Sequence, residues 1–243
     1  MSETTGAPGG WGATPAPRLE PPPVVTPPPF ISSPLAEPPE PLVPWISIWT
    51  RPRATLRQIL ETDPRRSVFL LAALGGIAGA LDLATASGTG DAYPVPVTLA
   101  VALAGGALGG VLFLFVFTAL ARVAGRWLGG RGETTEIMAA LAWANVPSIW
   151  SLLLWLPRAA LLGEEMFRLT PSVLEGNPPA ALFLGFLNLA QTLIWFWGLV
   201  ITLKCLGEAH RFSAGRALVT LALAALMIFV PIFLLMIAAQ ALS

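Results

Sequence analysis

Long apolar runs follow one another along the chain after residue 66, and they predict five membrane-spanning helices. Each run holds about 20 residues or more, which crosses a hydrocarbon core of about 30 Å at 1.5 Å per residue. Most of these runs lack the polar stripe of a helix on a soluble core. The five runs cover residues 67–86, 96–121, 137–156, 181–203 and 217–239. The pattern therefore predicts an all-α, polytopic integral membrane protein, with its membrane domain at residues 67–243.

Residues 1–44 follow a different pattern, because they hold 14 of the 24 prolines. Such a segment favours polyproline II and buries too little apolar surface to offset its ordering entropy. We predict a disordered, proline-rich cytosolic tail. Two roles stay open for it: a ligand that recruits a protein partner with an aromatic groove, or a spacer with no fixed partner.

Residues 45–66 predict a short cytosolic amphipathic helix before the first span. Pro52 suits the first turn of a helix. Leu56, Ile59 and Leu60 then share one helical face, and two arginines share another. Two tryptophans precede the helix, and indole rings prefer the headgroup region. The segment is either a helix lying on the membrane surface or an ordinary connector.

Composition supports the membrane assignment. Hydrophobic residues make up 55% of the chain, charged residues only 12%, and the mean hydropathy is +0.71, whereas soluble domains carry about 25% charged residues. The lipid bilayer is the expected partner, and a formal net charge of zero gives no field that would attract nucleic acid. Arginine outnumbers lysine thirteen to one, a bias that fits a GC-rich genome and a bacterial source.

The placement of basic residues predicts the direction of the chain. With five spans, the N-terminal region and the second-to-third and fourth-to-fifth loops share one side, which holds 12 of the 14 basic residues. The opposite side holds Arg158 and Arg168. The positive-inside rule then predicts a multi-pass protein of the cell (inner) membrane, with a cytosolic N-terminus and an extracytoplasmic C-terminus.

Glycines and prolines in the spans predict how the helices pack and bend. Small residues four apart let another backbone approach closely. The candidate packing residues are Gly75, Gly79, Gly105, Gly106, Gly109 and Gly110. They serve either the packing of the first two spans or the formation of a homo-oligomer. Pro147 and Pro231 should kink the third and fifth spans.

A few polar side chains lie inside the predicted spans, where they are costly and often functional. They are Asp82, Asn145, Asn188 and Gln191. Asp82 is either a proton or cation site or, because its span ends soon after it, an interfacial residue. The three amides either bond one helix to another or line a polar path.

No segment predicts catalysis. Residues 164–168 are one residue too short for the Glu-Glu-x-x-x-Arg signature of intramembrane CAAX-type proteases, and the histidines of such enzymes are missing. A Ser–His dyad would need the lone His210, which we expect in a loop away from the serines of the third span. The glycine turn 129–132 lacks the lysine of a phosphate loop. With Cys205 also alone, we expect no enzyme, catalytic residue, cofactor or metal site.

Three stretches together resemble a known family. They are residues 44–60, the run from the Gly-Gly-x-Gly turn at 129–132 to an alanine-rich segment ending at Pro147, and residues 206–213. In order and spacing the chain is similar, over about residues 45–240, to the Yip family of Ypt/Rab-interacting membrane proteins, in its bacterial branch. The resemblance implies five spans with a cytosolic N-terminus. The Rab and vesicle-traffic role of eukaryotic members is not carried over to a bacterial chain.

Three functions compete at this stage. The first is a non-enzymatic scaffold or interaction protein, whose tail or arginine-rich loops engage a partner or anionic lipid. The second is a small transporter or channel with a polar path through the bundle, although no internal repeat supports it. The third, an intramembrane enzyme, lacks histidine partners.

Overall fold

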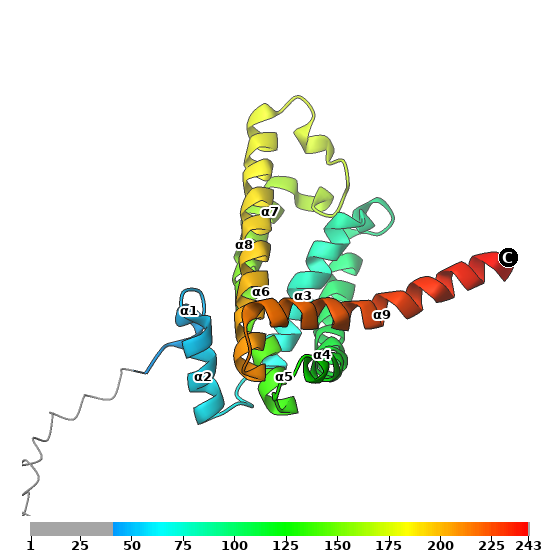
Figure 1. Ribbon diagram of the computed structural model, residues 1–243. Coiled ribbons are helices and arrows are strands. Elements are labelled where there is room, and N and C mark those ends of the chain that lie inside the picture. The colour runs from blue at the N-terminus through cyan, green and yellow to red at the C-terminus, as the bar shows by residue number, and fades with distance from the viewer. Residues whose placement is uncertain (1–40, 243) are drawn as a thin grey trace, which may run out of the picture. The chain divides into compact units, whose positions relative to one another are not determined.

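The computed structural model describes residues 41–242, and the regular structure of this part is helical (Figure 1). The elements are α1 Pro44–Ser47, α2 Pro52–Thr62, α3 Val68–Ala86, η1 Thr89–Asp91, α4 Val95–Trp127, α5 Thr134–Trp143, α6 Val146–Ser151, η2 Leu152–Leu154, α7 Trp155–Leu162, η3 Gly163–Glu165, η4 Ser172–Leu174, α8 Pro178–His210 and α9 Ala214–Leu242. The tail predicted at residues 1–44 lies outside the described residues except for 41–44.

Five helical stretches of the described chain are long and apolar enough to cross a membrane. They are Val68–Ala86, Val95–Trp127, Thr134–Glu165, Pro178–His210 and Ala214–Gln240. The predicted all-α fold with five spans is therefore confirmed. The second, third, fourth and fifth spans extend further at both ends than the apolar runs indicated.

Local sequence signals explain where several helices begin and end. At the start of α5 the backbone N–H of Glu133 donates to Glu136 Oε2 over 2.9 Å, and the Glu133 carboxylate accepts in return from the helix, which forms a capping box. At the start of α8 the Asn177 side chain accepts from the N–H of Ala180. The same helix ends at Arg211, whose φ of 60° is left-handed.

The third span is broken rather than kinked. Its first helix, α5, ends at Trp143, and α6 begins at Val146 with Pro147 in its first turn. Because proline lacks the N–H that would continue the ladder, the break falls in front of it. In α9, by contrast, Pro231 lies inside a helix that continues beyond it to Leu242.

Glycines let α3 and α4 lie backbone against backbone. A Cβ placed on Gly106 would lie 2.8 Å from the Cβ of Ala80 and 2.9 Å from the carbonyl oxygen of Gly76. One placed on Gly110 would lie 2.7 Å from the Cα of Gly76 and would also contact the Ala72 carbonyl oxygen. No larger residue fits this contact without separating the helices.

The amphipathic helix α2 turns its apolar face toward the bundle. Leu56 and Ile59 are buried, and they belong to the same core cluster as Ile137 of α5 and Ile201 of α8. A face that packs on protein in this way is not free to enter the headgroup region. Of the two roles that the sequence left open, this packing favours the connector over a helix lying on the membrane surface.

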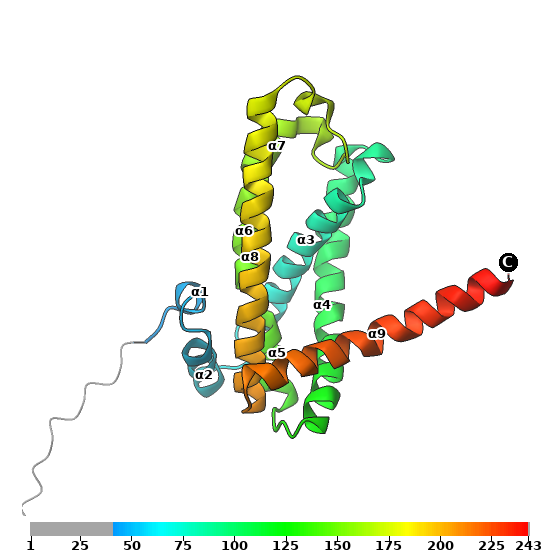
Figure 2. The same ribbon diagram turned by 45° about the horizontal axis from the view of Figure 1, so that its top comes forward.

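Helix α9 is arranged differently from the other spans. In both views it crosses α8 and α4 at a steep angle, and its C-terminal part projects beyond the bundle (Figures 1 and 2). Large apolar side chains on that part, such as Phe229, Phe233 and Leu235, are exposed. Length and hydropathy suit α9 to a membrane, but it does not run alongside α3, α4 and α8 in the described chain.

Candidate functional site

One hydrogen-bonded group of polar side chains joins three spans inside the bundle. Gln191 of α8 donates from its Nε2 to Asp82 Oδ2 of α3 over 2.9 Å and to Ser151 Oγ of α6 over 3.2 Å. The Ser151 hydroxyl in turn donates to the carbonyl oxygen of Ser148. Hydrogen bonds between membrane helices contribute about 0.6 kcal/mol on average and up to about 1.7 kcal/mol. This group therefore fixes α3, α6 and α8 to one another.

A second polar contact lies on the neighbouring turn of α8. Arg158 of α7 donates from Nη1 to Asn188 Oδ1 over 3.0 Å, and its guanidinium lies 5.4 Å from the ring centre of Trp155. Arg158 also interacts electrostatically with Asp82. The charge pattern puts Arg158 on the side opposite the N-terminus, beyond the third apolar run. In the structure it lies in α7, within the stretch Thr134–Glu165 that is long and apolar enough to cross a membrane.

Asn145 lies apart from the other predicted polar residues. Its Nδ2 donates to the Leu141 carbonyl oxygen over 3.2 Å, one turn earlier in the same span. Its side chain also fills the space beside Gly75, where an added Cβ would lie 2.6 Å from its Cγ. Asn145 thus bonds to the backbone at the break between α5 and α6. The structure does not bring it together with Asn188 and Gln191.

A groove of about 910 Å³ runs between α3 and α4. Small residues line most of its length, and Ser87, Thr89 and Tyr93 line one end. An added Cβ on Gly79 or Gly109 would meet nothing within 4 Å. These two glycines therefore open onto the groove, together with Gly105, whereas Gly106 and Gly110 are closed against α3. The four predicted glycines of α4 thus divide between two faces of that helix. Gly76 of α3, which is not among the predicted packing residues, completes the closed contact.

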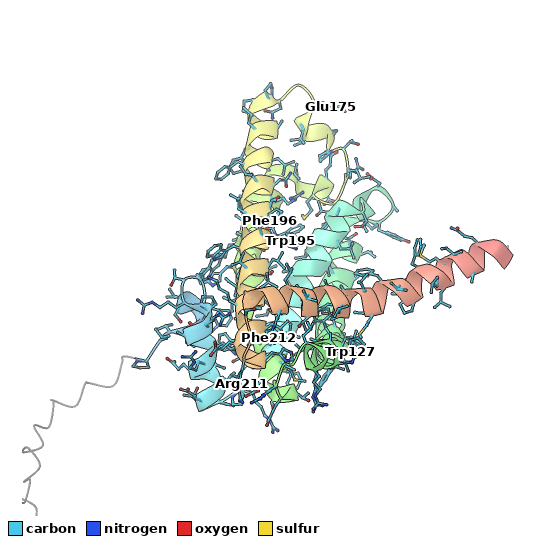
Figure 3. All side chains as sticks on the ribbon, in the orientation of Figure 1. Trp127, Glu175, Trp195, Phe196, Arg211 and Phe212 are labelled. Atoms are coloured by element: carbon cyan, nitrogen blue, oxygen red, sulfur yellow. The ribbon has the colours of Figure 1, made fainter. Side chains whose placement is uncertain are left out.

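The glycine turn 129–132 packs around the ring of His210 at the opposite end of the described chain from the loops near Glu175 (Figure 3). A Cβ on Gly130 would lie 2.6 Å from His210 Nδ1, and one on Gly125 would overlap the ring. The ring stacks on Phe212 with centres 5.0 Å apart. We expected His210 in a loop, but it is the last residue of α8 and is buried. Its ring fills the space between the ends of α4 and α8.

Polar contacts also fasten α2 to the end of α8. Arg57 forms an ion pair with Glu208 over 2.7 Å, and the hydrogen bond to that carboxylate raises the pKa of the exposed Arg57 guanidinium. The indole N–H of Trp197 donates to the Trp49 carbonyl oxygen over 3.1 Å. These contacts join residues about 150 positions apart, so they hold the segment before the first span against the fourth span.

The three stretches that carry the family resemblance thus meet at one end of the membrane domain. The connector 206–213 contacts helix α2 through Glu208 and the glycine turn 129–132 through His210. The described part of the chain is thus an all-helical domain with five candidate spans, which places it in the class of polytopic membrane proteins. The chain belongs to the Yip1 domain family, which matches residues 46–236. The comparison with curated proteins and that with solved structures gave no match.

Sequence reasoning missed several residues of these sites. Ser151 is one of the serines of the third span that the sequence analysis weighed for a Ser–His dyad, whereas its hydroxyl accepts from Gln191. Arg158 follows the end of the third apolar run, and the sequence therefore indicates only the side of the membrane on which it lies. Neither residue carries a local signal of its partner, because the partners lie on other spans.

Proposed function

We propose that this Yip1-domain protein is a non-enzymatic membrane scaffold or interaction protein of a bacterial inner membrane, with its N-terminus in the cytosol. The observation that carries the proposal is that the intramembrane polar side chains form hydrogen bonds with one another between helices. Gln191 bonds to Asp82 and Ser151, and Asn188 bonds to Arg158. These groups hold helices together, as a rigid support requires.

A small transporter or channel is the second candidate, and it needs polar groups that converge on a path. Asn145 lines the groove between α3 and α4, whereas Asn188 and Gln191 do not line that groove. Apolar and glycine residues make up most of the groove wall. Such a wall offers few groups that could replace the hydration shell of an ion, which favours the scaffold.

The proposed absence of enzymatic activity has its own support. Within residues 41–242 no group of three or more His, Cys, Asp or Glu side chains could hold a metal ion. His210 is surrounded by glycines and stacks on Phe212, and neither of its ring nitrogens has a side-chain hydrogen-bond partner among the described residues. A histidine that activates a nucleophile is hydrogen-bonded to it.

Vesicle flux measurements separate the scaffold from the transporter. The full chain is reconstituted, and the flux of protons and of potassium is compared with that of protein-free vesicles. We expect no difference between the two. A flux that Asp82→Asn or Gln191→Leu abolishes in a folded protein would refute the scaffold and establish the polar path.

Crosslinking in intact membranes tests the interaction role. The full chain is compared with a variant in which residues 1–40 keep their composition but have a scrambled order. If the proline-rich tail is a ligand, a defined crosslinked protein should disappear in the scrambled variant. If the tail is a spacer, crosslinks should persist in the scrambled variant and map to the arginine-rich loops. The absence of any crosslinked protein in both chains would contradict the proposal.

A further inference from the structure

A cluster of arginines surrounds a cavity at the end of α4. Arg122 and Arg126 lie one helical turn apart, and Arg131 follows in the glycine turn. Together with Gly132, Glu133, Thr134 and Thr135 they line a space of about 480 Å³. We propose that this arginine cavity binds the phosphate group of an anionic phospholipid.

The charge of the cavity is not neutralised by the described protein. Within residues 41–242, Arg122, Arg126 and Arg131 form no ion pair and no side-chain hydrogen bond, and the Nε of Arg122 is buried without a partner. Other arginines at the same end do have acidic partners: Arg57 pairs with Glu208 and Arg211 with Glu136.

Glu133 also lines the cavity and is its one acidic group among the described lining residues. Its carboxylate accepts a backbone hydrogen bond in the capping box of α5, so it is committed to the helix. Three guanidinium groups and one carboxylate leave a formal charge of about +2. Guanidinium groups bind phosphate oxygens through paired, charge-assisted hydrogen bonds.

A second pocket of about 240 Å³ continues from the arginines along α4 toward the centre of the span. It shares Arg122, Arg126 and Thr134 with the arginine cavity, and Phe115, Ala119, Val123 and Met138 form its apolar wall. Phe115 and Val123 are 47% and 44% exposed on the outer face of α4, so the pocket is open to lipid.

Thr118 supplies a polar group inside this second pocket. Its side chain is 1% exposed, and its hydroxyl has no hydrogen-bond partner among the described residues. From the end of α4 toward the centre of the span, the two arginines are therefore followed by Thr118 and then by Phe115. A phospholipid presents its groups in the same order: phosphate, ester carbonyl and acyl chain. Free phosphate would occupy the arginine cavity alone, so the second pocket favours lipid as the source.

The position along the helix agrees with this ligand. Helix α4 is apolar from Val95 to Ala121, and the arginines follow directly. Trp127 is 66% exposed next to them, at the same end of the described chain as Arg211 (Figure 3). Exposed tryptophans and arginines at the end of a span mark the depth of the headgroups. The proposed site does not depend on the scaffold proposal, because a transporter would hold the same lipid.

Native mass spectrometry of the full chain in neutral detergent tests the site. The probes are phosphatidylglycerol, phosphatidylcholine and inorganic phosphate, each titrated against the intact protein. We expect phosphatidylglycerol to bind at least about tenfold more tightly than phosphatidylcholine. Both lipids carry the phosphate, but the choline cation of phosphatidylcholine would be repelled by the three arginines, and about 1.4 kcal/mol of such repulsion is tenfold.

The double variant Arg122→Gln/Arg126→Gln should remove this preference. Its matched control, Arg65→Gln/Arg66→Gln, removes the same charge from two exposed residues directly before α3. The control should keep the preference for phosphatidylglycerol. Thr118→Val should lower the affinity for phosphatidylglycerol about threefold and leave the affinity for inorganic phosphate unchanged. If the double variant misfolds by circular dichroism and size exclusion, Arg131→Gln in the turn tests the same cavity.

Three results would overturn the proposal. The first is equal binding of phosphatidylglycerol and phosphatidylcholine. The second is an equal loss in the control variant, which would indicate general charge attraction. The third is phosphate that competes fully with phosphatidylglycerol while Thr118→Val has no effect, which would assign the cavity to a free anion.

Discussion

Two adjacent glycines of α4 allow a sharp test of the packing between α3 and α4. Gly110 faces α3, and an added Cβ would lie 2.7 Å from the Cα of Gly76. Gly109 faces the open groove, and an added Cβ would meet nothing within 4 Å. Gly110→Ala and Gly109→Ala therefore make the same chemical change one residue apart in the same helix.

The expected magnitude follows from this difference. Alanine is favoured over glycine in a helix by about 1 kcal/mol at both positions, so that gain cancels in the comparison. What remains is the overpacking of the methyl group of Gly110→Ala against backbone, which costs about 1–3 kcal/mol. For a protein of this size 1 kcal/mol shifts the melting temperature by about 2–4 °C, so the two variants should differ by about 2–12 °C.

Thermal unfolding in detergent, followed by circular dichroism and by fluorescence-detected size exclusion, measures this difference. Gly110→Ala should melt below the parent protein, and Gly109→Ala should melt at or slightly above it. Equal destabilisation of the two variants would show that α4 is rotated from the orientation described here. A shift of Gly109→Ala alone to a smaller assembly would show that the open glycine face joins two copies of the chain.

Three further measurements test other features. In a double-mutant cycle of Gln191→Leu and Asp82→Asn, the two changes should couple by about 0.6–1.7 kcal/mol of unfolding free energy, and strict additivity would contradict the hydrogen bond. Gly130→Ala should lower the melting temperature because its methyl group meets the ring of His210, and His210→Ala in the same chain should relieve that clash; no relief would contradict the packing of the turn. A reporter active only outside the cytosol should work when fused after Ser243 and fail when fused after Gly130, and the reverse result would refute the predicted direction of the chain.

The five spans could be predicted because the length of an apolar run constrains a membrane helix whatever its neighbours are. The pairing of Asp82 with Gln191 could not, since 109 residues separate them. Periodicity places a side chain on a helical face but does not say which helix that face meets. The glycines of α4 show the same limit: the pairs 105/109 and 106/110 have equal spacing, and the rotation of the helix decides which pair meets α3.

The amphipathic pattern of residues 45–66 illustrates a second limit. An apolar face predicts burial, and Leu56 is indeed buried. The same face suits a bilayer surface or a protein surface equally well. The contacts that decide between them, such as the ion pair of Arg57 with Glu208, come from residues that follow much later in the chain.

The packing of the glycine turn around His210 has a consequence for the order of assembly. The turn at residues 129–132 leaves the ribosome well before its packing partner. At about 5–20 residues per second, the 78 residues from 132 to 210 take roughly 4–16 seconds to synthesise. The first three spans therefore enter the membrane with the space around this turn unfilled, and the fourth span completes the junction on arrival. A nascent chain stopped before residue 210 would therefore present this turn without the imidazole ring that fills it in the complete chain.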